Sequence, residues 1–151
     1  MGTGYGSSTT SAPATGEDVP VQLGVFVYGT LRPGSWNHGA WLEAFLAGPC
    51  RPARLDGFAL HHHDGLPAVV PDLGRSVVGE IADLDPVRYD AALRTLDVLE
   101  GTAHGHYLRV TARVAGGEEV WLWVAGARVA ANFGPDTTLV EHGDWLAVRE
   151  G

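Results

Sequence analysis

The chain has 151 residues, enough for one domain, and its 45% hydrophobic and 19% charged residues are typical of a globular protein. The formal net charge is -8 and all ten basic residues are arginines without a basic stripe, so nucleic acid and anionic membrane surfaces are not expected as partners. The lone Cys50 excludes an intrachain disulfide, and no apolar run approaches the roughly 20 residues of a membrane span. We expect a cytoplasmic protein that binds a small molecule; its oligomeric state stays open.

Residues 1–20 are mostly Gly, Ser, Thr, Ala and Pro and have almost nothing to bury, which predicts a flexible tail ahead of one domain over residues 21–151. The first element of that domain is a strand over residues 25–28, a β-branched and aromatic run bounded by glycines. A loop over residues 29–34 follows, and apolar residues at helical spacing then predict a short helix over 40–46.

The middle of the chain divides into short strand-like runs between turn residues. Strands are predicted over residues 55–62, 68–70 and 77–81. A helix then begins with Asp85 as its N-cap and Pro86 in its first turn, and Gly101 ends it as a left-handed residue.

The last part of the domain begins with a predicted hairpin. Strands over residues 107–114 and 119–124 are joined by a turn at Gly116-Gly117, and residues 139–145 read as mostly irregular. Strands outnumber helices and are adjacent in the sequence, so we predict an α+β fold: a small mixed or antiparallel β-barrel with short flanking helices.

The corner after the first strand is a candidate binding site. In Tyr28-Gly29-Thr30-Leu31, the glycine lets the backbone bend and lets a ligand approach. Successive free amides at such a corner form an anion-binding concavity that suits a carboxylate. The alternative is a plain turn after a core strand.

Glu100 is a candidate general base. It lies at the predicted C-terminal end of the Asp85 helix, where the helix dipole disfavours an anion, and Asp97 adds like-charge repulsion from one turn earlier. Both effects raise the carboxyl pKa when the site is partly buried, and a base that works near neutral pH requires such a pKa. The alternative is a solvated surface glutamate.

Histidines form two local groups. His61-His62-His63 invites a metal interpretation, but neighbouring strand residues point to opposite faces, so a polar strand end with one packed histidine is favoured. His104 and His106 follow Glu100 and could line the mouth of a site or lie in a solvated loop. Cys50 stands between turn residues and reads as an inert, half-buried thiol.

An ordered set of short motifs resembles the γ-glutamylcyclotransferase-like, or AIG2-like, family. The matches span residues 25–145 and are Val27-Tyr28-Gly29-Thr30-Leu31-Arg32, Gly65-Leu66-Pro67-Ala68, Val78-Gly79-Glu80-Ile81, Leu96-Asp97-Val98-Leu99-Glu100-Gly101, Tyr107-Leu108-Arg109 and Gly143-Asp144-Trp145. The resemblance implies a compact β-barrel and release of 5-oxoproline from γ-glutamyl amides, without cofactor or metal.

The same resemblance implies roles for particular residues. Glu100 maps to the family's base, Tyr28 to Leu31 would hold the substrate, and Tyr107 resembles a tyrosine that lines the pocket, whereas Arg109 reads as structural. Residues 102–106 lie where members vary, so the leaving amine stays open. Two other functions remain: a non-catalytic module that binds a small carboxylate, and metal-dependent hydrolysis through the histidines.

Overall fold

The computed structural model describes residues 21–134 and 138–150, and side chains up to residue 147. The predicted flexible tail over residues 1–20 lies outside the described residues. Among the described residues, no helix is long and apolar enough to cross a membrane.

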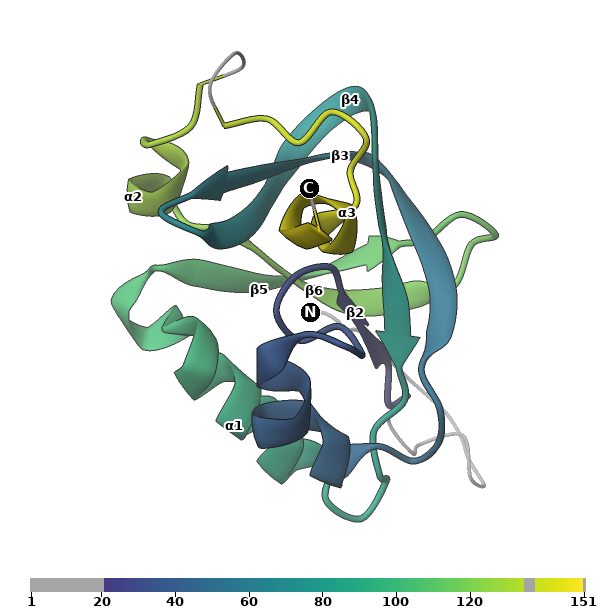
Figure 1. Cartoon of the computed structure of the whole chain (residues 1–151). Helices are drawn as coiled ribbons and strands as arrows, with labels where there is room; N and C mark the ends of the chain where they lie inside the picture. The colour runs from purple at the N-terminus through teal and green to yellow at the C-terminus, as the bar shows by residue number, and fades with distance from the viewer. Residues whose placement is uncertain (1–20, 135–137, 151) are drawn as a thin grey trace, which may run out of the picture.

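A mixed five-stranded sheet forms the centre of the molecule, in the strand order β3-β4-β2-β6-β5 (Figure 1). The strands are β2 (Gly24–Val27), β3 (Arg51–His63), β4 (Leu66–Ala82), β5 (Tyr107–Arg113) and β6 (Glu119–Ala125). Strand β2 is central: it pairs antiparallel with β4 and parallel with β6, and all four of its residues are buried. The predicted strand at 25–28 and the predicted hairpin of β5 and β6 are confirmed.

Short helices flank the sheet, as predicted for an α+β fold. They are the π-helix η2 (His38–Leu42), the 3-10 helices η3 (Glu43–Phe45) and η4 (Thr102–His104), and the α-helices α1 (Tyr89–Glu100), α2 (Ala127–Ala130) and α3 (Trp145–Glu150). Helix α1 ends at Gly101, whose φ of 67° is the left-handed conformation predicted for it. Asp85 is not its N-cap: the helix begins four residues later, and the Asp85 carboxylate accepts a hydrogen bond from the Val87 amide in the preceding turn.

The prediction of three short strands over residues 55–62, 68–70 and 77–81 is wrong, because this part of the chain forms only two long strands, β3 and β4. They form one long antiparallel hairpin whose register shifts between the pairs Asp56–Ser76 and Phe58–Pro71. Gly57 alone therefore lies opposite residues 72–75, so the Asp-Leu-Gly sequence that resembles a turn bulges out of the ladder and the strand continues.

The sheet is not closed into the predicted barrel. Strands β3 and β5 are its edges, and no ladder joins them among the described residues. A backbone hydrogen bond of 2.8 Å from the amide of Ala115, just beyond β5, to the carbonyl of Arg54 in β3 brings the edges together at one point. The sheet is thus curved and open.

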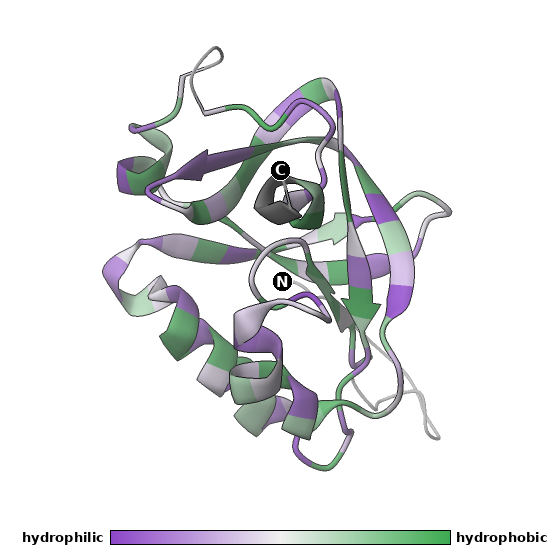
Figure 2. Cartoon of the chain, in the orientation of Figure 1, coloured by the Kyte–Doolittle hydropathy of each residue, from purple (hydrophilic) through white to green (hydrophobic). Residues whose placement is uncertain are grey.

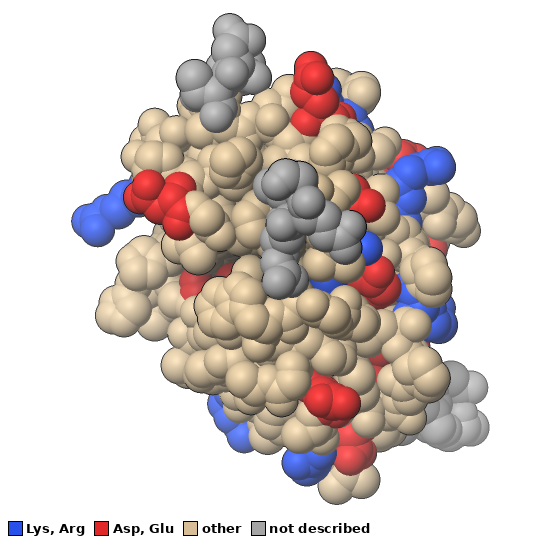
Figure 3. Space-filling model, in the orientation of Figure 1, with Lys and Arg blue, Asp and Glu red and all other residues tan. Residues whose placement is uncertain are grey.

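Two apolar clusters hold the elements together. One packs side chains of β3, β4 and β6 with Trp145 of α3, and the other packs α1 and the loops before β3 against Trp123 and the ends of β2. Hydrophobic and hydrophilic residues are interspersed along α1 and the longer strands (Figure 2), as expected for elements with one buried face. Acidic and basic side chains are interspersed on the face drawn in Figure 3.

Candidate functional site

A cavity of about 300 Å³ lies where the loop after β2 meets the end of α1, the start of β5 and the tip of the β3–β4 hairpin. Its walls include every residue that the sequence singled out as catalytic or substrate-binding: Tyr28, Gly29, Thr30, Leu31, Glu100 and Tyr107. Segments separated by some 70 residues along the chain therefore meet around one space.

Gly29 allows the loop to approach the β3–β4 hairpin. A Cβ built at this position would lie 2.4 Å from Cγ of Pro67, closer than any side chain permits. The Tyr107 hydroxyl donates a hydrogen bond of 2.7 Å to the carbonyl of Pro67, which fixes the hairpin from the other side. These contacts fix one side of the cavity before any ligand arrives.

The loop itself offers unused backbone donors. Arg32 N–H closes the turn onto the carbonyl of Gly29 at 3.0 Å, while the amides of Gly29, Thr30 and Leu31 donate to none of the described residues. The side-chain amide of Asn37 donates to the Thr30 hydroxyl at 3.0 Å, and the Asn37 backbone amide donates to the Thr30 carbonyl at 3.0 Å. Adjacent free amides on a braced turn can bind a carboxylate.

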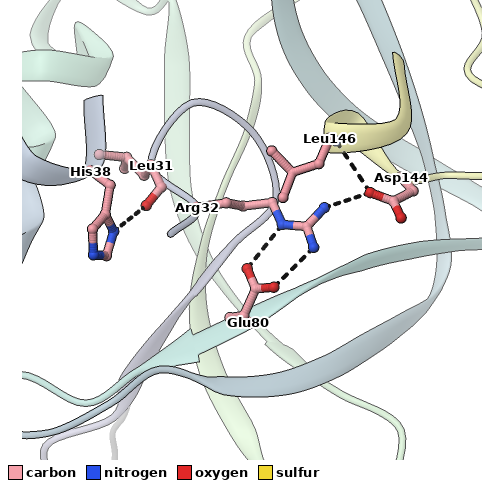
Figure 4. A network of polar contacts seen from close by, with 6 residues as sticks. All are labelled: Leu31, Arg32, His38, Glu80, Asp144 and Leu146. Atoms are coloured by element: carbon pink, nitrogen blue, oxygen red, sulfur yellow. Dashed lines mark hydrogen bonds and ion pairs between the residues drawn. The ribbon is translucent and has the colours of Figure 1, made fainter. Parts of the chain in front are cut away.

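Arg32 anchors this loop to two distant segments (Figure 4). Its guanidinium donates two hydrogen bonds of 2.9 Å to the Glu80 carboxylate on β4, and a third of 2.7 Å to Asp144 just before α3. Arg32 is 5% exposed, so its guanidinium has lost most of its hydration, and the hydrogen bonds to the two carboxylates compensate for that loss. The anchor fixes the residue that immediately follows the free amides.

Glu100 occupies the last position of α1 and lines the cavity. Burial, and then the negative charge of Asp97, raise its pKa from 4.5 to about 7. Among the described residues, no hydrogen bond or ion pair reaches this carboxylate. Glu100 therefore titrates near neutral pH and is free to exchange a proton with a ligand.

Asp97 is fixed by neighbours that leave Glu100 free. Its carboxylate accepts hydrogen bonds from Arg109 at 3.0 Å and from the indole of Trp123 at 2.9 Å. Arg109 also lies over the ring of Trp121, 4.3 Å from the centroid. Arg109 is thus in the supporting position expected of a structural residue.

Buried Tyr28 and half-buried Tyr107 complete the walls. The Tyr28 hydroxyl donates to the Trp123 carbonyl at 2.8 Å. Burial, and then the charges of its neighbours, raise the pKa of Tyr28 well above its usual value, and burial and the Glu100 charge do the same for the pKa of Tyr107. Both hydroxyls stay protonated, so they can donate hydrogen bonds but cannot act as bases at neutral pH.

The histidine groups divide as the strand pattern suggests. His61 is buried, hydrogen-bonded to Thr138 and stacked on Phe133, which confirms the expectation of one packed histidine. His106 lines the cavity, whereas His104 does not. Within residues 21–134 and 138–150, no group of three or more His, Cys, Asp or Glu side chains could hold a metal ion. Cys50 is half-buried, and burial raises the pKa of its thiol.

Sequence reasoning missed the partners of Arg32. Glu80 and Asp144 lie 48 and 112 residues from it, and nothing local connects them. The sequence does contain a hint of these partners, because Glu80 and Asp144 each belong to one of the motifs quoted above and have no role assigned there. The opposite charges make the pairing plausible, but the motifs also contain Asp97, Glu100 and Arg109, so charge alone does not select the partners.

Comparison with known proteins places this geometry in a family. The family described as "Gamma-glutamyl cyclotransferase, AIG2-like" matches residues 25–147. A Methanocaldococcus jannaschii protein provisionally named a gamma-glutamylcyclotransferase is 32% identical over 133 residues, 83% of this chain and 97% of its own length. The Citrobacter rodentium gamma-glutamylcyclotransferase family protein ytfP is 32% identical over 122 residues, 81% and 94% of the two chains.

Solved structures agree with the fold. An AIG2-like protein from Mus musculus superposes with a TM-score of 0.59 at 26% identity, over 82% of this chain and 87% of its own. Escherichia coli ytfP gives a TM-score of 0.56 at 27% identity, over 85% and 100% of the two chains. The chain belongs to the AIG2-like gamma-glutamyl cyclotransferase family.

Proposed function

We propose that the protein is a γ-glutamyl cyclotransferase that releases 5-oxoproline and a free amine from a γ-glutamyl amide. The observation that carries the proposal is Glu100: a carboxylate with a pKa of about 7, unpaired among the described residues, in the same cavity as the free amides of residues 29–31. A γ-glutamyl group has an α-carboxylate that the backbone amides can bind and an α-ammonium that can pair with Glu100. Family membership supports the same chemistry.

Binding orients the substrate for ring closure. The amides of Gly29, Thr30 and Leu31 receive the α-carboxylate, which directs the neighbouring α-ammonium toward Glu100. The side chain of the γ-glutamyl group then folds back so that its γ-carbonyl lies within reach of the α-nitrogen. Holding two groups of one molecule at bonding distance supplies a large share of the rate enhancement.

Glu100 moves the protons of the reaction. Its carboxylate takes a proton from the α-ammonium, and the amine lone pair attacks the γ-carbonyl carbon to form the lactam C–N bond. The resulting carboxylic acid gives its proton to the leaving nitrogen of the tetrahedral intermediate, the bond to that nitrogen breaks, and the regenerated carboxylate takes the second proton from the ring nitrogen. Those two protons pass to the leaving nitrogen, so the products are 5-oxoproline and a protonated amine.

The test is the Glu100→Gln variant, assayed by mass spectrometry for 5-oxoproline over a panel of γ-glutamyl amides. Gln is nearly isosteric but cannot accept a proton, so turnover falls by at least about 10²-fold, the lower end of general-base contributions. Binding of γ-glutamyl ligands, measured by thermal shift, persists. The matched control is Glu119→Gln on an exposed face of β6, which retains full turnover.

Two outcomes would overturn this function. Wild-type turnover in Glu100→Gln would remove the base from the mechanism. Thermal stabilisation of the wild-type protein by γ-glutamyl ligands, with no 5-oxoproline from any amide, would indicate a module that only binds small carboxylates.

A further inference from the structure

A second cavity, of about 190 Å³, adjoins the first. The two share three lining residues, Leu66, His106 and Tyr107, so they are neighbouring compartments with a common wall. The second is completed by the tip of the β3–β4 hairpin and by α2, which lie beside the start of β5 at the left of Figure 1. The second cavity is therefore the adjoining space for a ligand too long for the first.

The polar groups of the second cavity favour a cation. Asp64 is its carboxylate, with His63, Asn132 and the shared His106 around it. Among the described residues that line either cavity, none is Lys or Arg. An anionic group would thus meet a carboxylate with no fixed positive charge to offset it, whereas an ammonium would gain an ion pair. The Asp64 side chain is 85% exposed, so water screens this pair and its contribution is modest.

The hairpin turn holds Asp64 in place. His63 pairs with Leu66, which leaves Asp64 and Gly65 as a two-residue turn with φ of 54° and 78°. Positive φ at both positions is the geometry that Asp-Gly adopts in such hairpins. His63 lies 3.4 Å from the Asp64 carboxylate. Leu66, 54% exposed, and Val129 provide an apolar stretch between Asp64 and the first cavity.

We propose that this second cavity binds the amine half of the substrate and selects amines with a short apolar chain that ends in a second, cationic nitrogen. The inference rests on the proposed function, because it assigns the leaving group of that reaction. The γ-glutamyl group would occupy the first cavity, the scissile amide would lie near His106 and Tyr107, and the far ammonium would pair with Asp64.

Three γ-glutamyl amides test the proposal, each with the same four-methylene chain and ending in ammonium, methyl or carboxylate. The measurement is kcat/KM for 5-oxoproline release. The wild-type protein should prefer the ammonium compound to the methyl compound by about threefold, as expected for an ion pair with an exposed carboxylate, and should use the carboxylate compound least. Equal rates for ammonium and methyl, or a preference for carboxylate, would overturn the inference while leaving the proposed cyclotransferase intact.

Variants of the second cavity test whether Asp64 causes the preference for the ammonium compound. In Asp64→Asn, which keeps a residue tolerant of positive φ, the ammonium-to-methyl ratio should fall about threefold. Asp72→Asn is the matched control, because this exposed carboxylate lines neither cavity, and it should keep the wild-type ratio. Asn132→Asp adds a carboxylate to the cavity without altering the turn and should raise the ratio. An unchanged ratio in both Asp64→Asn and Asn132→Asp would overturn the assignment, whereas absence of product from every amide would instead reject the proposed function.

Discussion

The side chain with the most unusual environment is Glu100. Two features raise its pKa: loss of water around the carboxylate, and the charge of Asp97 one turn away. The Arg109–Asp97 pair limits the second effect, because it partly neutralises Asp97. Burial is therefore the main reason that Glu100 can act as a base at neutral pH.

This environment predicts the pH dependence of the reaction. A base must be ionised to act, so log kcat/KM should rise with a slope of one as pH increases up to about 7, the pKa of Glu100, and should then level off. Stopped assays from pH 5 to 9 with one γ-glutamyl amide measure it. In Asp97→Asn the midpoint should move to lower pH, because the variant removes a negative neighbour and leaves Arg109 unpaired. A flat profile between pH 5 and 7 would contradict the assignment of Glu100.

Among the elements, the loop after β2 depends most on distant contacts. Arg32 is buried between Glu80 and Asp144, and loss of one partner from a buried ion pair leaves the remaining charges without compensation (Figure 4). Arg51 makes a similar pair of contacts, with Asp83 and Glu118, but its side chain is 45% exposed. The two arginines form a natural comparison between buried and solvated networks.

Arg32→Gln should destabilise the fold by about 3 kcal/mol, whereas Arg51→Gln should cost less than about 1 kcal/mol. Denaturant unfolding measures both. Because Arg32 anchors the amides that receive the α-carboxylate in the proposed mechanism, its variant should also raise KM by about tenfold, with a smaller change in kcat. Equal stability losses in the two variants, or an unchanged KM in Arg32→Gln, would show that the network does not position the loop.

The elements also show what the sequence could predict. The sequence predicts three features correctly because glycines flank or terminate them: strand β2, the β5–β6 hairpin and the end of α1. The β3–β4 hairpin was divided because Asp72-Leu73-Gly74 resembles a turn, and only the partner strand reveals that it is a bulge. Helices α2 and α3 were missed because four and six residues are too few for a periodic pattern.

The site was predictable to a similar extent. Glu100 and residues 28–31 were identified from local rules and from the motifs, and the structure brings them to one cavity. The arginine network and the second cavity depend on contacts between distant segments. Pairing Arg32 with Asp144 spans 112 residues, and no local pattern encodes such a contact.

For the molecule as a whole, one sheet joins two apolar clusters. Leu60 is fully buried in the cluster that includes Trp145, and Leu96 in the cluster that includes Trp123. Strand β2 contributes Phe26 to the first and Val25 to the second. Because one strand serves both, neither cluster can be lost while the other stays intact, and unfolding should be a single cooperative transition.

Leu60→Ala and Leu96→Ala should therefore each lower the free energy of unfolding by about 2 to 5 kcal/mol without splitting the transition. Urea denaturation followed by both tryptophan fluorescence and circular dichroism measures this. Leu73→Ala, at a position 93% exposed on the β4 bulge, is the control and should change stability by less than about 0.5 kcal/mol. Non-coincident fluorescence and dichroism curves in either core variant would show that the clusters unfold separately.

The central position of β2 separates the parts of the site that can vary from those that cannot. The loop with the free amides follows a strand that is paired along both of its edges, and Gly29 has no room for even a methyl group. The second cavity is built from a hairpin tip and a four-residue helix at the periphery. Substitutions at the periphery therefore have room to change which leaving group fits, whereas substitutions at the central loop would disturb the packing on which the whole cavity depends.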